Sequence, residues 1–252
     1  MPRPLACAAA GLLAVSAPLA AQVTTPTEAA RHSIWIVYGG DHAVSRRAGL
    51  VFDSQLRLTQ DADHQRQLLI RPGASYALNS RVKLSAGYAL MVARDDGGDP
   101  LSPRQPEHRA WFSAQLAHEL GPVAFAHRYR AEHRWLPGVE IDDAGARLGE
   151  TYVTAERMRY GLRASIPLAP GARGRDMYLA ASDEVFASFG GYAGDVAVDQ
   201  NRAAVALGFR ASTSLRLEVG YMLQSSGADG RLDEQNHTLQ IAAFSTAPLR
   251  RR

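Results

Sequence analysis

The stretch DQNRAAVALGFRASTSLRLEVGYMLQ, residues 199–224, alternates large apolar side chains with small or charged ones along two arms joined by a polar turn. A period of two is typical of a β-strand with one apolar face. Each arm has about the length of a membrane-crossing strand, roughly 9 to 11 residues. If the apolar face meets lipid, the charged face must line a closed barrel. The apolar positions are Ala203, Val205, Leu207, Phe209, Leu215, Leu217, Val219, Tyr221 and Leu223.

The same alternation predicts strands along most of the chain. The segment 33–39 is short and has no clean polar side, so its place in the wall stays open. Single-chain bacterial barrels normally have an even number of strands. With 33–39 the count is eleven, so either this segment is not a full wall strand or a twelfth strand is present. The other expected strands are 48–59, 66–78, 81–93, 108–118, 122–135, 155–168, 175–187, 199–211, 214–224 and 236–246.

The connections alternate between short and long, and the longest is an expected loop of about twenty residues from Leu136 to Thr154. Outer-membrane barrels alternate short periplasmic turns with longer external loops. The sequence therefore predicts an all-β fold: an antiparallel transmembrane (outer-membrane) β-barrel of ten to twelve strands. A soluble periplasmic β-sandwich is the less favoured alternative, because its outward faces would be polar.

The first 21 residues predict a cleaved signal peptide, with Arg3 before an apolar run from Leu5 to Leu19 and small residues at the cleavage site. Cleavage removes Cys7, the one cysteine, and with it any thiol or disulfide chemistry. No later apolar run reaches 18 residues, so no transmembrane helix is expected. We expect 22–32 to be a periplasmic lead, 33–247 the barrel and 248–252 a basic tail, in the cell outer membrane.

The composition argues against several other functions. The net charge is +3, but no basic cluster carries interleaved aromatics, so nucleic-acid binding is not expected. No cofactor or metal motif is present, and we expect no cofactor. Acidic residues gather in two loops, where solvated side chains are favoured over a metal site: Asp61, Asp63 and His64, and Asp95, Asp96 and Asp99.

Several short pieces, in order along the chain, resemble a family of uncharacterised bacterial outer-membrane β-barrel proteins, grouped only as a domain of unknown function. The resemblance implies an outer-membrane barrel with no established activity. Such barrels usually end in a strand with a terminal aromatic, whereas this chain ends Pro248 to Arg252, so Phe244 is the candidate for that position. The matching pieces are 71–73 with Tyr76, 84–88, 107–111, 127–132, 157–160, 178–184, 199–202 and 236–237.

The polar face of the strands carries many charges, with an excess of arginine. Arg–carboxylate pairs and water can fill a narrow interior. Alternatively, surplus arginine makes a positive conduit or pocket that selects anions. Lys83, Glu107 and Arg134 fall on this face too. The candidate lumen-lining residues are Asp53, Arg57, Arg71, Arg109, Arg128, Arg130, Glu132, Arg157, Arg159, Arg163, Glu184, Arg202, Arg216 and Glu218.

The predicted function is a non-enzymatic narrow channel or envelope component with an Arg-rich lumen. Its expected partners are outer-membrane lipids, the barrel-assembly machinery and small anionic solutes. The alternative is an outer-membrane lipid hydrolase or deacylase at the barrel rim. That enzyme would need Ser225 or Ser226 near His237, with Asn236 or Asp233 orienting the imidazole.

Overall fold

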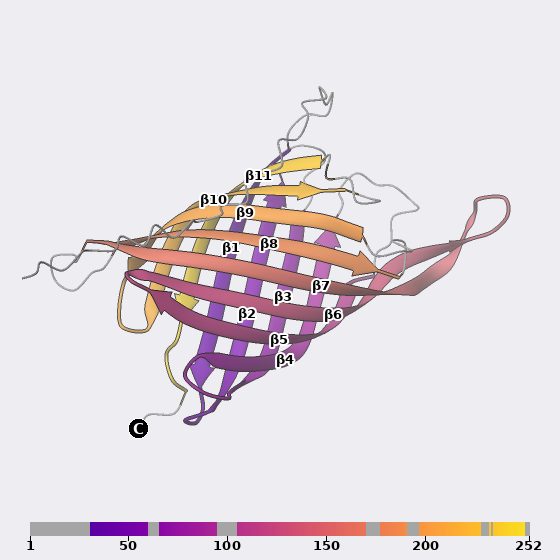
Figure 1. Cartoon of the computed structure of the whole chain (residues 1–252). Coiled ribbons are helices and arrows are strands. Elements are labelled where there is room, and N and C mark those ends of the chain that lie inside the picture. The colour runs from indigo at the N-terminus through magenta and orange to yellow at the C-terminus, as the bar shows by residue number, and fades with distance from the viewer. Residues whose placement is uncertain are drawn as a thin grey trace, which may run out of the picture.

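The computed structural model describes residues 31–59, 66–94, 105–169, 177–190, 197–227, 232 and 234–249, which form one closed barrel of eleven strands (Figure 1). Within this part of the chain no helix is long and apolar enough to cross a membrane. The strands are β1 (Arg31–Ala43), β2 (Ala48–Thr59), β3 (Arg66–Ala77), β4 (Val82–Arg94), β5 (Glu107–Leu120), β6 (Val123–Ile141), β7 (Arg147–Ala169), β8 (Met177–Phe189), β9 (Ala197–Arg210), β10 (Leu215–Ser226) and β11 (Glu234–Ser245).

The predicted fold class is confirmed, and the open question about residues 33–39 is answered. They belong to β1, a full wall strand that starts at Arg31, inside the stretch expected to be a periplasmic lead. β1 pairs antiparallel with β2 and parallel with β11, and it closes the barrel. An odd number of strands needs one such parallel pair. The described residues contain no twelfth strand, so the even-number rule does not hold here.

The alternation of β1 was hidden because its inner positions carry few charges. Trp35 is buried at 4 % exposure, while its neighbour Ile36 is 48 % exposed. Val37 and Gly39 lie on the same face of the strand as Trp35, so both faces of the segment consist of apolar or small residues. A strand with two uncharged faces gives no clean period-two signal.

The β1–β11 seam gives a first testable result. Ile36 and Ile241 are register partners across it, and neighbouring strands lie about 4.8 Å apart, within the reach of a disulfide. In a Cys7→Ser background, we expect I36C/I241C to form an intramolecular disulfide, seen as a reductant-sensitive shift on gels after boiling. The matched pair I36C/A243C, displaced by two residues along β11, should crosslink poorly. Equal crosslinking of both pairs would contradict the parallel register.

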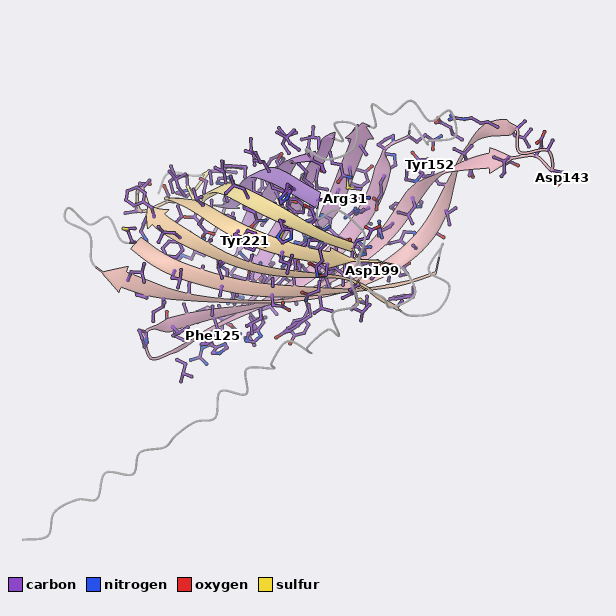
Figure 2. All side chains as sticks on the ribbon, turned by 90° about the horizontal axis from the view of Figure 1, so that it is seen from above. Arg31, Phe125, Asp143, Tyr152, Asp199 and Tyr221 are labelled. Carbon is purple, nitrogen blue, oxygen red and sulfur yellow. The ribbon has the colours of Figure 1, made fainter. Side chains whose placement is uncertain are left out.

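The expected loop at 136–154 is wrong. β6 continues to Ile141 and β7 begins at Arg147, with paired residues from Leu136↔Val153 to Glu140↔Gly149. This hairpin projects beyond the barrel (Figure 1), and Figure 2 shows Asp143 at its far tip. Pro137 argued against a strand, because proline cannot donate to a ladder. It is tolerated because the last β6 residue paired with β5 is Trp135, so Pro137 lies on a free edge.

The two faces of the wall have opposite chemistry. Outward side chains are apolar and exposed, as Val205 at 53 % and Val219 at 56 % illustrate. Many inward side chains are charged and buried, with Arg71 at 2 % and Glu132 at 1 % exposure. Soluble proteins bury apolar residues and leave charges in water. An apolar exterior around a polar interior is the architecture of a transmembrane β-barrel.

Candidate functional site: the charged interior

One connected ion-pair network occupies the interior. Its centre is Glu132 on β6, whose side chain is fully buried. Glu132 Oε1 accepts from Arg159 Nη1 at 2.8 Å and lies 3.6 Å from Arg71 Nη2. Glu132 Oε2 accepts from Arg109 Nη1 at 3.5 Å. These three arginines come from β7, β3 and β5, so the contact with β3 passes over two intervening strands.

The network continues from each of these arginines. Arg71 Nη1 donates to Asp53 on β2 at 2.9 Å. Arg159 Nη2 donates to both oxygens of Glu184 on β8 at 2.9 Å. Arg109 donates through Nε and Nη2 to Glu107 at 2.8 and 2.9 Å. Arg128 on Glu184 and Arg134 on Glu107 complete it, at 2.9 and 2.6 Å. Burying charged side chains is costly unless each is paired with an opposite charge, as the arginines and carboxylates of this network are.

Two smaller groups lie beside this network. Glu218 Oε1 accepts from Arg163 Nη2 at 2.7 Å and from the Tyr178 hydroxyl at 2.6 Å. Asp199 Oδ2 accepts from Arg157 Nη2 at 2.5 Å and from the Ser188 hydroxyl. Both groups link non-adjacent strands, β7 with β10 and β7 with β9.

Four of the predicted arginines have no carboxylate partner among the described residues, and each lies over an aromatic ring. Guanidinium groups are attracted to the faces of such rings. Their carbon-to-centroid distances are 4.1 Å for Arg57 over Trp35, 4.9 Å for Arg130 over Trp111, 4.7 Å for Arg202 over Phe186 and 5.7 Å for Arg216 over Phe244.

Two inward glycines explain how a tryptophan fits inside so narrow a barrel. A Cβ at Gly73 would lie 2.5 Å from Trp111 Cζ2, and one at Gly87 would lie 2.9 Å from the same atom. Gly73 and Gly87 are register partners on β3 and β4, next to the Trp111 strand. The absence of both side chains is therefore what makes room for the indole.

Described residues line two cavities in the interior, of about 330 and 430 Å³. The larger, here called the turn-end cavity, reaches residues at the ends of β1 and β11 that adjoin the short turns, Asp41 and Ser245. Glu107 and Arg134 do not line it and lie toward the long connections. Five cationic side chains and two carboxylates line it: Arg71, Lys83, Arg128, Arg130, Arg216, Asp41 and Asp53.

Of the fourteen residues predicted to line a lumen, ten take part in the ion pairs described above, and the remaining four are the arginines over aromatic rings. That these residues line an open lumen stays a prediction. Sequence reasoning did not select the inward aromatics Trp35, Trp111 and Phe186, or Asp199. The alternation along the strand could have shown that two of them point inward. Trp111 is two residues from Arg109, and Phe186 is two residues from Glu184, so each lies on the same face as a charged residue.

Those residues of the proposed rim hydrolase that the structure describes do not form a catalytic group. His237 Nδ1 and the Tyr221 hydroxyl are 2.5 Å apart. Asn236 Oδ1 instead accepts from the Ser33 hydroxyl at 3.1 Å. Adjacent strand residues point to opposite faces, so Asn236 is not placed to orient the His237 ring. Ser225 and Ser226 pair in register with Gln235 and Glu234, whereas His237 pairs with Leu223. Asp233 lies outside the described residues.

The two acidic loops considered as metal sites, at 61–64 and 95–99, also lie outside the described residues. Among the residues that the structure describes, no group of three or more His, Cys, Asp or Glu could hold a metal ion. The predicted signal peptide, 1–21, and the last three residues of the basic tail are likewise outside the described part.

The fold and the interior together define a β-barrel of the transmembrane type with a charge-filled interior. The chain belongs to the family described as "Protein of unknown function (DUF2490)", which matches residues 32–236. A solved structure entitled "NanC porin structure in rhombohedral crystal form" is similar, with a TM-score of 0.46 and 9 % identity over 77 % of this chain and 84 % of that one. No curated protein matches the chain.

Proposed function

We propose that this protein is a non-enzymatic β-barrel of the Gram-negative outer membrane that forms a narrow, anion-selective channel. The observation that supports this best is the excess of guanidinium groups in the interior. The turn-end cavity is lined by more cationic than anionic side chains. A pore lined by an excess of arginine favours anions, because a cation is repelled by the guanidinium groups that have no carboxylate partner.

The outer membrane is the location that the chemistry of the wall favours. Side chains such as Leu207 and Ile241 present an apolar surface around a closed sheet. A closed sheet leaves no unpaired backbone edge in hydrocarbon, which is why barrels can span a bilayer. On this basis the short turns face the periplasm and the long β6–β7 hairpin faces outward.

The network around Glu132 makes this a restricted channel and not a wide pore. Phe186, Leu69 and Glu132 are each almost fully buried within the barrel. The two interior cavities described above measure about 330 and 430 Å³. Only small solutes or single ions fit such spaces, and larger ones would require the ion pairs to rearrange.

In planar bilayers we expect a small unitary conductance with a preference for anions. The double variant R128Q/R130Q should lower both the conductance and the anion preference, because it removes two of the five cations of the turn-end cavity. R147Q, on the hairpin outside the barrel, is the matched control and should behave as wild type. Reversal potentials in a salt gradient measure the preference. No conductance at any voltage, or a preference for cations, would remove the channel.

A further inference from the structure

A group of buried hydrogen-bond donors on β5 and β6 has no partner among protein groups. The atoms are Trp111 Nε1, Ser113 Oγ, Arg128 Nε, and Arg130 Nε and Nη1. Arg130 is 7 % exposed, and Ser113 is its register partner on the neighbouring strand. Arg130 also lies over the Trp111 ring at 4.9 Å. All four residues line the turn-end cavity.

The chemistry of these atoms is one-sided. Guanidinium and indole nitrogens can only donate hydrogen bonds, and a serine hydroxyl can donate as well as accept. Buried polar groups in folded proteins nearly always have partners. A set of unpaired donors on side chains that line one cavity therefore calls for an acceptor. An acceptor that satisfies several donors at once, such as an oxyanion, fits this arrangement.

The carboxylates of the cavity do not fill this role. Asp53 accepts from Arg71 and Gln55, and Asp41 pairs with Lys83. Arg128 uses Nη2 for Glu184 and leaves Nε without a partner. Arg130 has no ion pair among the described residues. The local field is therefore positive at the place where the unpaired donors gather.

We propose that the turn-end cavity contains a binding site for a small oxyanion, a carboxylate or phosphate group, held by Arg130 and Ser113 with Arg128 and Trp111 beside them. This proposal depends on the proposed channel only in that the channel would give the anion a route to the site. Ionised acceptors make shorter and stronger hydrogen bonds with guanidinium than neutral ones do. The indole beneath Arg130 holds the guanidinium plane in place. A cation is disfavoured, because the atoms offered to it are donors.

Isothermal titration of the folded barrel in zwitterionic detergent tests the site. Inorganic phosphate and acetate form the two arms, each at constant ionic strength in chloride, and Trp fluorescence gives a second reading beside Trp111. We expect saturable binding of one anion per chain in at least one arm. The arm that binds more tightly identifies the group. R130Q should weaken binding about tenfold or more, and S113A severalfold, because each removes donors to a charged acceptor.

Arg57→Gln is the matched control. Arg57 is another interior arginine over a tryptophan without a carboxylate partner among the described residues, but it lines neither cavity. R57Q should bind as wild type. The heat-dependent gel shift establishes that each variant is folded, and S113A keeps the test decisive if R130Q does not fold. Absence of saturable binding in both arms, or equal affinity in wild type and S113A, would overturn the site.

These results are separable from the bilayer recordings. Saturable phosphate or acetate binding without conductance would support the site and remove the channel. Anion-biased conductance without saturable binding would keep the channel and overturn the site.

Discussion

Glu132→Gln should destabilise the barrel by about 3–5 kcal/mol, the cost of removing one partner from a buried ion pair. Glutamine keeps the size of the side chain and removes its charge. Three guanidinium groups lie within 3.6 Å of the Glu132 oxygens. Without that carboxylate the three buried guanidinium groups repel one another. The change in unfolding free energy is measured by urea unfolding in lipid vesicles, with the heat-dependent gel shift as the probe of the folded fraction.

Two comparisons make the result specific. Glu150→Gln removes an ion pair of the projecting hairpin, Glu150 with Arg147 at 2.5 Å. That variant should change the unfolding free energy by less than about 1 kcal/mol, as partly exposed pairs do. The double variant E132Q/R159Q should recover part of the lost unfolding free energy, because it removes one of the three guanidinium groups that lose the Glu132 carboxylate in E132Q. If E132Q unfolds within about 1 kcal/mol of wild type, the network is not what holds the interior together.

Val205→Arg should cost about 2–4 kcal/mol in lipid vesicles, the penalty for an arginine on the lipid face near the bilayer midplane. Val205 lies near the middle of β9 and is 53 % exposed. In a water-soluble protein, an exposed valine replaced by arginine changes stability by no more than about 0.5 kcal/mol. The size of the effect therefore reports directly on what touches the wall.

Ile141→Arg is the paired control, because Ile141 is equally exposed, at 55 %, but lies at the end of β6 on the projecting hairpin. It should leave the unfolding free energy in vesicles close to wild type. Equal, small effects at Val205 and Ile141 would mean that β9 faces water.

The inward and outward faces of most strands could be predicted, because alternate residues of a strand point to opposite faces and this pattern is visible in the local sequence. Arg157, Arg159 and Arg163 alternate with apolar neighbours, so any register that buries one buries all three. Partners could not be predicted in this way. Arg163 meets Glu218 from β10, a pairing that depends on how far the strands are staggered around the barrel. The sequence of a single strand does not show how far it is staggered against its neighbours.

Two further features depend on non-local geometry. The parallel closure of β1 on β11 depends on the number of strands in the whole barrel. The inner positions of β1 from Ser33 to Gly39 carry no charge that would have shown which face points inward. The β6–β7 hairpin is a strand pair because Leu136 to Glu140 find partners on β7, even though Pro137 and Gly138 break the local pattern. The inward positions of Trp111 and Phe186 could have been inferred from the alternation along their strands. The sequence did not show that Gly73 and Gly87 on neighbouring strands would make room for Trp111.

Site-directed spin labelling of β9 tests the central claim most directly. With Cys7 the one native cysteine, single cysteines can be placed at each position from 203 to 208 in a Cys7→Ser background and labelled in lipid vesicles. The account predicts that collisions with dissolved oxygen alternate with a period of two, high at 203, 205 and 207 and low at 204, 206 and 208. High accessibility of 205 and 207 to a water-soluble nickel complex would contradict it.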